Sequence, residues 1–182
     1  MLAPHVPLLR PGLHSLDRFV SHIARRGSWF GGGSVAALCA ALAAALLEKI
    51  VVQAAPARAL REIRRDCLGL IQKDADAFAR VIKTTQRKDQ SAFRSSLNTA
   101  IDIPCRVFEQ AERIQSACRM AQRTVKPQYQ SDLRCALAVA LAAAESARTL
   151  VITNLAWLND PATTRQIERR LQTAQRYARP AR

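Results

Sequence analysis

Residues 28–50 read SWFGGGSVAALCAALAAALLEKI, with three glycines directly before a run rich in alanine and leucine. Glycine is the least favourable helix residue after proline, and alanine is the most favourable. The change in composition therefore marks the start of a helix, which we expect over 34–53 with Ser34 as its N-cap. Because this segment is apolar on nearly every side, the helix is expected at the centre of the fold.

The rest of the chain repeats apolar residues at three- and four-residue spacing and shows no alternation typical of strands. Hydrophobic residues make up 49% of the chain but aromatic residues only 5%, so the core must be built from small and aliphatic side chains. We predict an all-α bundle of about six or seven helices, in which two Ala-rich helices, 34–53 and 132–158, pack closely at the centre. The other helices are expected over 15–25, 58–85, 91–100, 104–124 and 161–179.

Individual residues set several of the predicted boundaries. Ser15 is expected to cap the first helix, and Pro104 to kink or restart a later one. Asp160 followed by Pro161 is typical of a cap and first turn, and predicts the start of the last helix. The apolar spacing of the third helix places Phe78 on the face that points inward.

Composition predicts a single cytoplasmic domain without a metal. The five cysteines form no CxxC pair and the three histidines all lie near the N-terminus, so free buried thiols are expected rather than a metal site. The N-terminus lacks the features of a signal peptide, and the apolar run at 35–47 is shorter than the ~20 residues that cross a bilayer. We expect a protein with no membrane partner that forms one domain over 1–182, with an irregular lead-in at 1–14.

The net charge of +14, from 28 basic and 14 acidic residues, indicates which classes of binding partner suit the protein. It suits a nucleic acid, an anionic membrane surface or an anionic small molecule, and arginines on solvated helix faces explain it equally well. A nucleic-acid partner is not favoured, because the sequence contains no recognised binding motif and few aromatic residues for base stacking. Two basic stretches keep that alternative open: Arg58, Arg61, Arg64 and Arg65, and Arg165, Arg169, Arg170 and Arg176.

The glycine motif at 31–34 has a physical use beyond starting a helix. Glycines allow positive φ and a close approach of the backbone to another group. The helix start at Ser34 offers free N–H groups and the positive end of the helix dipole, which together can bind an anion or a carbonyl oxygen. A flexible loop that enters a helix explains the motif as well, and the lysine of a P-loop is absent.

The order of the motifs along the chain is more informative than the glycines alone. GGGSVAALCAALAAAL, KDADAF, IDIPCRVFEQA, SDLRCALAVALAAAESA and ITN follow one another. This set resembles the cyclodeaminase/cyclohydrolase family, which comprises the helical domain of formiminotransferase-cyclodeaminase and its free-standing relatives. The resemblance implies an all-helical homodimer that acts on one-carbon derivatives of tetrahydrofolate. Members either close a formimino group with loss of ammonia or hydrolyse the 5,10-methenyl bridge.

The resemblance also implies site residues. The folate site would comprise Gly31, Gly32, Gly33, Ser34 and Asn154. Asp74 and Asp132 match two acids of the family and are expected as catalytic carboxylates, one accepting a proton from water and the other protonating the leaving nitrogen. Arg25 and Arg26 are expected to pair with the glutamate tail. A reduced folate, polyglutamylated forms included, is the expected substrate, and no further cofactor is expected.

Each of these residues also has a plain structural explanation. Asp74 suits a solvated charge beside Lys73, and Asp132 suits the acid that starts many helices. Asn154 suits a side chain that hydrogen-bonds a neighbouring backbone group. Arg25 and Arg26 suit a solvated helix end.

The chain departs from the family pattern at several positions. Phe30 replaces the proline before the glycines, and Leu150 replaces the first of two asparagines. The family's lysine-tyrosine region is absent after Gln53, where this chain reads VVQAAPARAL, and KTTQRKD replaces a Leu-Pro-Lys. Three alternatives to an active enzyme therefore stay open: a diverged folate-binding protein, a structural dimer and a basic helical nucleic-acid-binding protein.

Overall fold

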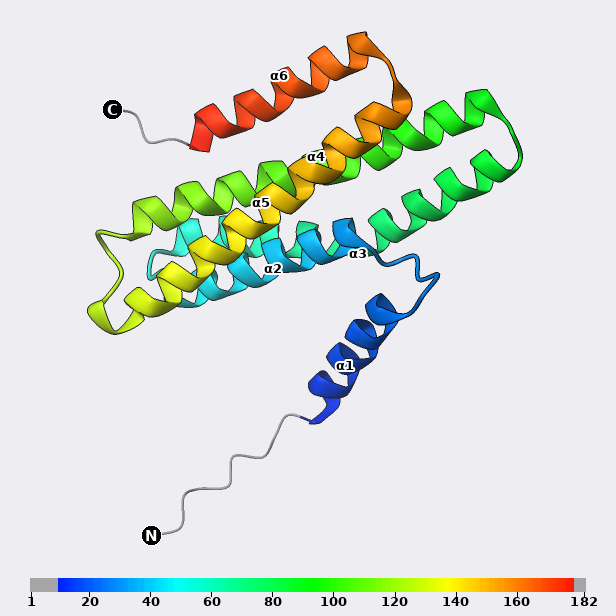
Figure 1. Ribbon diagram of the computed structural model, residues 1–182. Coiled ribbons are helices and arrows are strands. Elements are labelled where there is room, and N and C mark those ends of the chain that lie inside the picture. Colours follow the sequence, from blue (N-terminus) through cyan, green and yellow to red (C-terminus); the bar gives the residue numbers. More distant parts are fainter. Residues whose placement is uncertain (1–9, 179–182) are drawn as a thin grey trace.

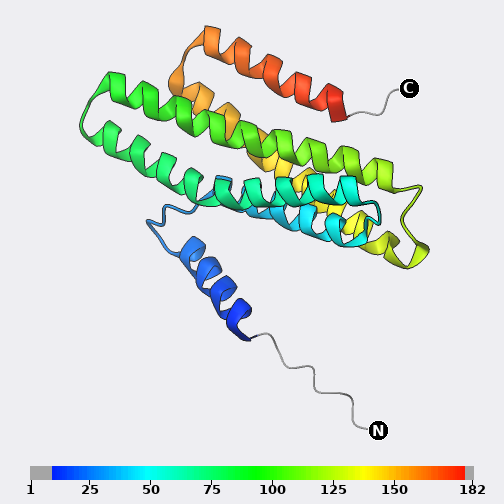
Figure 2. The same cartoon turned by 180° about the vertical axis from the view of Figure 1, so that it is seen from behind.

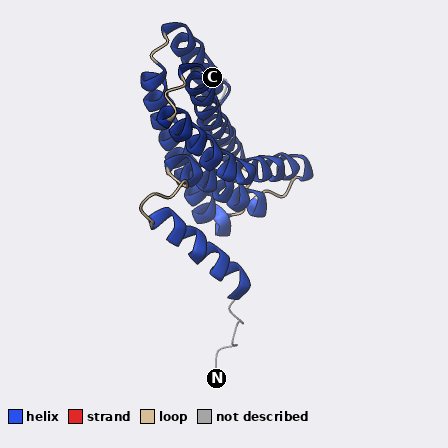
Figure 3. Ribbon diagram, turned by 90° about the vertical axis from the view of Figure 1, so that its right-hand side faces the viewer, coloured by secondary structure: helices blue, strands red, loops and turns tan. Residues whose placement is uncertain are grey.

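The computed structural model describes residues 10–178, and within them every regular element is a helix, as predicted (Figure 3). A short 3₁₀ helix, η1 (Pro127–Tyr129), accompanies the α-helices. The six α-helices are α1 (Arg10–Ala24), α2 (Gly32–Ile50), α3 (Ala54–Gln86), α4 (Gln90–Ala121), α5 (Gln130–Leu158) and α6 (Pro161–Ala178).

Helices α2 to α5 form a bundle, with α2 packed against α3, α4 and α5 (Figures 1 and 2). Helix α6 lies along α4 on the side away from α2, and α1 stands apart from the bundle. The prediction that the two Ala-rich helices pack at the centre is confirmed, because α2 and α5 are in direct contact. By length and composition α2 and the segment 127–158 could each span a membrane, although the apolar run of α2 was expected to be too short; in this structure the two helices pack against each other.

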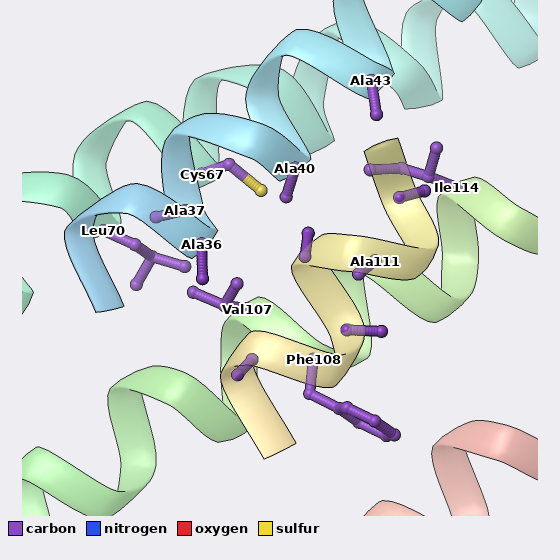
Figure 4. Packing of buried hydrophobic residues seen from close by; sticks show 14 of the residues in the cluster. Ala36, Ala37, Ala40, Ala43, Cys67, Leu70, Val107, Phe108, Ala111 and Ile114 are labelled. Carbon is purple, nitrogen blue, oxygen red and sulfur yellow. The ribbon is translucent and has the colours of Figure 1, made fainter. Parts of the chain in front are cut away.

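The core is built from small side chains on α2 and larger ones on its neighbours. Figure 4 shows Ala36 of α2 close to Val107 of α4, and Ala43 of α2 pointing toward Ile114 of α4. All of these side chains are almost completely buried. Alanine lets the helix axes approach closely, and each buried large side chain contributes about 1.5–3 kcal/mol to stability.

The cysteines follow the predicted pattern in part. Cys67, Cys105 and Cys118 are buried and free, whereas Cys135 is exposed. Burial raises the pKa of the Cys67 thiol to about 12. The buried thiols therefore stay protonated and act as small apolar side chains.

Helix α1 begins earlier than predicted. It starts at Arg10, so Ser15 lies inside it and does not cap it. The predicted lead-in over residues 1–14 is therefore helical from residue 10 onward, and its first nine positions lie outside the described residues.

Helix α2 also begins earlier than predicted. It starts at Gly32 with Gly31 as N-cap, so Ser34 is in the first turn and bonds to another helix instead of capping its own.

Helix α4 runs without interruption through Pro104, where two separate helices were predicted. A proline removes the N–H that would bond to the carbonyl four residues earlier, here that of Ala100. Asn154 on α5 supplies a replacement donor, as described below. The prediction for the last helix is confirmed, because Asp160 directly precedes α6 and its carboxylate accepts a hydrogen bond from the Ala162 N–H in the first turn.

Candidate functional site

A cavity of about 230 Å³ lies at the N-terminal end of α2, where the loop from α1 joins the bundle (Figure 1). The cavity is lined by Gly31–33 at the start of α2, by Asp74 of α3 and by Asn154 of α5. Its other lining residues are Trp29, Phe78, Val81, Leu97, Ala100, Pro104, Leu150, Thr153 and Trp157. Two larger hollows, of about 720 and 660 Å³, lie against α6 and contain none of the predicted site residues.

Gly33 and Asp74 are in direct contact across the α2–α3 interface. A Cβ atom at position 33 would lie 2.5 Å from the Asp74 Cγ and 2.7 Å from its Oδ2. Real Cβ atoms do not approach other atoms so closely, so any other residue at position 33 would force the Asp74 carboxyl to move. A Cβ atom at position 32 would make ordinary contact with Leu150, and one at position 31 would meet open space. Gly33 is therefore the one glycine of the motif whose missing side chain makes room for Asp74.

Ser34 holds the carboxylate in place. Its side chain is fully buried, and its Oγ lies 3.0 Å from the Asp74 Oδ2 and 3.0 Å from the Ile71 carbonyl oxygen. The hydroxyl has one hydrogen, so it donates to one of these acceptors at a time. With Asp74 ionised, we expect the hydroxyl to donate to the carboxylate. With Asp74 protonated, the hydroxyl can donate to the carbonyl and accept from the acid.

Burial raises the pKa of the Asp74 carboxyl above its ordinary value of 3.8. Hydrogen bonds from the side chain and backbone of Ser34 act in the opposite direction, but more weakly. A carboxyl with a raised pKa exchanges its proton more readily near neutral pH than an exposed aspartate does. The solvated charge considered for Asp74 is therefore not what the structure shows.

Asn154 lines the same cavity and has the structural contact considered for it. Its Nδ2 donates a hydrogen bond of 2.8 Å to the carbonyl oxygen of Ala100 on α4. This is the carbonyl that loses its helical donor because residue 104 is proline.

Three aromatic side chains at the cavity were missed by sequence reasoning. Trp29 and Trp157, which are both of the chain's tryptophans, are 48% and 54% exposed, and Phe78 is 40% exposed. The rings of Trp29 and Phe78 pack edge to face with centroids 6.2 Å apart. Phe78 had been predicted to point inward, and the observed core position beside it is instead Ala77. The available signal in the sequence was the scarcity of aromatic residues, because both tryptophans of the chain line this one cavity.

The structure does not bring Asp132 to this cavity. Its Oδ2 accepts a hydrogen bond of 2.9 Å from Lys49 Nζ at the C-terminal end of α2. That end lies about 24 Å along the helix from Gly33, at 1.5 Å per residue. Among the described residues that line the cavity, Asp74 is the one carboxylate. Arg25 and Arg26 are exposed in the loop before Trp29 and do not line the cavity.

The arrangement combines one partly buried carboxyl group with apolar and aromatic walls. Leu150, at the position where the resemblance implies asparagine, contributes an apolar side chain beside Gly32. Such a site suits a flat heterocycle whose reacting atoms exchange protons with a single acid–base group.

Comparisons with known proteins agree with this picture. The formiminotransferase-cyclodeaminase family matches residues 15–173 of the chain. The fold is similar to the crystal structure of formiminotetrahydrofolate cyclodeaminase from Thermotoga maritima, with a TM-score of 0.83 and 20% sequence identity over 90% of this chain and 89% of that one. No curated protein matches the sequence significantly. Since the family match spans most of the sequence, the chain belongs to the formiminotransferase-cyclodeaminase family.

Proposed function

We propose that the protein is an enzyme of folate one-carbon metabolism that uses Asp74 as its acid–base group. The reaction is either the cyclisation of 5-formiminotetrahydrofolate with loss of ammonia or the hydrolysis of 5,10-methenyltetrahydrofolate. The observation that carries this proposal is the Asp74 carboxyl, which packs against Gly33, bonds to Ser34 and borders a cavity lined by aromatic side chains.

Cyclisation needs one proton to move between two nitrogens of the substrate. N10 attacks the carbon of the protonated formimino group, and the new C–N bond leaves N10 with an extra proton. Ionised Asp74 accepts that proton and passes it to the former imino nitrogen, which then leaves as ammonia. The methenyl cation remains, and Asp74 returns to its ionised form. A carboxyl whose pKa is raised by burial suits both halves of this transfer.

Hydrolysis of the methenyl bridge can use the same group in the same two steps. Water attacks the cationic carbon, and ionised Asp74 takes one of its protons. The acid then protonates N5 as the C–N5 bond breaks, which leaves the 10-formyl product. The proton from the hydroxyl of the intermediate goes to solvent. Because one carboxyl can serve both steps, the proposal needs neither Asp132 nor a cofactor.

The size of the cavity indicates which part of a folate it would hold. At about 230 Å³ it is smaller than the 300–1,000 Å³ typical of sites for whole drug-sized ligands. We propose that the pterin ring and the one-carbon unit lie in the cavity between the aromatic side chains. The glutamate tail would extend over the surface outside the cavity. Arg25 and Arg26 are exposed there, a few residues before Trp29 in the sequence.

The main test follows the absorbance of the methenyl cation. Purified protein is incubated with 5-formiminotetrahydrofolate, and separately with 5,10-methenyltetrahydrofolate. A rise in absorbance in the first reaction identifies a cyclodeaminase, and an accelerated fall in the second identifies a cyclohydrolase. Folate binding without either change would indicate a diverged, non-catalytic relative. No binding of either compound would contradict the proposal.

The net charge of +14 leads to a separate prediction about affinity. If the basic surface binds the glutamate tail, affinity should rise with the number of glutamates and fall with added salt. Titration of mono- and polyglutamylated folates at several salt concentrations measures this. Random duplex DNA is the comparison, and tight binding with a slope near one unit per neutralised phosphate would favour the nucleic-acid alternative.

The contacts of the basic stretches weigh against that alternative. Arg61 and Arg64 both bond to the Glu48 carboxylate. Arg170 bonds to Glu109 and Asp102 on α4. These arginines connect helices within the chain, so the positive charge free for phosphates is smaller than the sequence indicates.

We also propose that the protein is a homodimer that uses the outward face of α2. Leu42 is 56% exposed on α2, although most of the apolar residues of this helix are buried. Leu16 and Val20 on α1 are also about half exposed, and α1 makes few contacts with the bundle of its own chain (Figure 3). A second copy would cover these apolar side chains.

Light scattering at micromolar concentration tests the dimer. We expect a mass twice that of the chain for the native protein and for Met120→Glu, which changes an exposed apolar residue beside α6. Leu42→Glu should give monomers with unchanged helical circular dichroism. A monomeric native protein would contradict the proposal, and so would a dimer that Leu42→Glu leaves intact.

A further inference from the structure

Pro104, Ala100 and Asn154 form a unit in the wall of the cavity. Pro104 lies inside α4 and has no N–H, so the carbonyl oxygen of Ala100 lacks its helical donor. The Nδ2 of Asn154, from α5, donates to that oxygen at 2.8 Å. All three residues line the cavity.

This contact determines which way the Asn154 amide faces. If the amide turned over, its Oδ1 would meet the Ala100 carbonyl oxygen, and two acceptors would be opposed without a proton between them. The nitrogen is therefore held at α4, and the Oδ1 atom is the free hydrogen-bond acceptor of this side chain. No described residue donates to it in the contacts found within 10–178.

The other polar side chains of the cavity also offer acceptors. The Thr153 hydroxyl donates to the Thr149 carbonyl at 3.0 Å, which leaves its oxygen lone pairs free. Ionised Asp74 has acceptor oxygens only. Ligand atoms that face these groups should therefore be hydrogen-bond donors.

We propose that Pro104 acts as a positioning residue for Asn154, and that the Asn154 Oδ1 selects ligands by accepting a hydrogen bond from an N–H group. For a pterin, these donors are the 2-amino group and the ring N–H beside it. The inference deepens the proposed function and depends on it for the identity of the ligand. Asn154 would discriminate among heterocycles, whereas Asp74 moves the proton.

The first experiment measures ligand discrimination by calorimetry. The probes are 5-formyltetrahydrofolate and its analogue with a methyl group in place of the 2-amino group. We expect the native protein to prefer the amino compound by about tenfold or more, because the analogue lacks one of the two donors that face the Asn154 oxygen and places a methyl group there instead. Asn154→Ala and Pro104→Ala should each reduce this preference to about twofold or less. The double variant should be no worse than either single variant, because both changes disable the same contact.

The second experiment needs no ligand. Asn154→Ala leaves the Ala100 carbonyl unpaired, and we expect it to lower the melting temperature by about 2–4 °C. In the Pro104→Ala background the restored N–H bonds to Ala100, so the same change should have little effect. Pro56→Ala is the matched control, because Pro56 lies in the first turn of α3 and away from this cavity. Pro56→Ala should alter neither the preference for the amino compound nor the loss of melting temperature caused by Asn154→Ala.

The two experiments separate this inference from the proposed function. If the native protein binds the amino compound but the two variants keep its preference, the inference is wrong and the folate assignment stands. If the native protein binds neither compound, the proposed function is wrong, and ligand selection by Asn154 is wrong with it. Additive effects of the two substitutions on the melting temperature would show that Pro104 does not position Asn154.

Discussion

Replacing Asp74 by Asn is expected to reduce turnover by about 100-fold or more, the usual loss when a positioned acid–base group is removed. Asparagine keeps the size of the side chain and can still accept a hydrogen bond from Ser34, but it cannot take a proton from N10 or from water. Steady-state rates with both folate substrates measure the effect. Folate affinity should change far less than turnover, because an asparagine oxygen still accepts a hydrogen bond from the ligand but cannot take its proton.

The same substitution should not destabilise the fold. Burial raises the pKa of Asp74, so the folded state holds its proton more tightly than the unfolded chain does. The tighter proton binding favours the folded state. This stability is fully present below the ordinary pKa of 3.8 and is lost as the pH rises through the raised pKa of the folded protein. At neutral pH the ionised carboxylate therefore costs stability, and asparagine removes that cost. We expect an equal or higher melting temperature for Asp74→Asn at neutral pH.

Asp132→Asn is the comparison for this prediction. Asp132 pairs with Lys49 at the far end of α2, and both side chains are partly solvated. We expect turnover within about threefold of the native rate, because such pairs contribute little. A loss as large as that of Asp74→Asn would mean that a second chain brings Asp132 to the cavity. Full activity of Asp74→Asn would rule out the proposed proton transfer.

The sequence was sufficient for the helical fold because that fold depends on local patterns. The spacing of apolar residues predicted α3 and α6 closely, and the Asp160 cap was visible as a dipeptide. Pro104 was misjudged because its effect depends on Asn154, which lies on another helix. No local pattern shows that a distant amide will replace a missing N–H.

The site was predictable to a similar degree. The glycine motif, Asp74 and Asn154 could be named from the order of the motifs, and the structure places them around one cavity. The aromatic residues were not found, since Trp29, Phe78 and Trp157 come from three separate segments without a common spacing. The specific role of Gly33 was also hidden, because three adjacent glycines look alike until the structure shows which one meets Asp74.

Replacing Gly33 by Ala should have the second large effect. The added Cβ would lie 2.5 Å from the Asp74 Cγ, so the carboxyl has to move away from Ser34. A displacement of about 1 Å in a catalytic group can reduce turnover by about 100-fold. The strain should also lower the free energy of unfolding by about 1–3 kcal/mol. Turnover assays and thermal denaturation measure the two effects.

Gly32→Ala and Gly31→Ala are the matched controls within the same motif. At position 32 the new methyl group makes ordinary contact with Leu150, and at position 31 it meets open space. Neither change should destabilise the protein, because neither methyl group meets the Asp74 carboxyl. Equal losses at all three positions would indicate that the motif needs flexible backbone instead of space for Asp74.

A double substitution identifies the cause of the loss at Gly33. If the alanine methyl group acts by displacing the carboxyl, then removing that carboxyl should remove the strain. Gly33→Ala combined with Asp74→Ala should therefore regain the stability lost in Gly33→Ala, while turnover stays low because the acid–base group is gone. If Gly33→Ala costs the same stability with and without Asp74, the two residues do not act as a pair, and Gly33 is required for another reason.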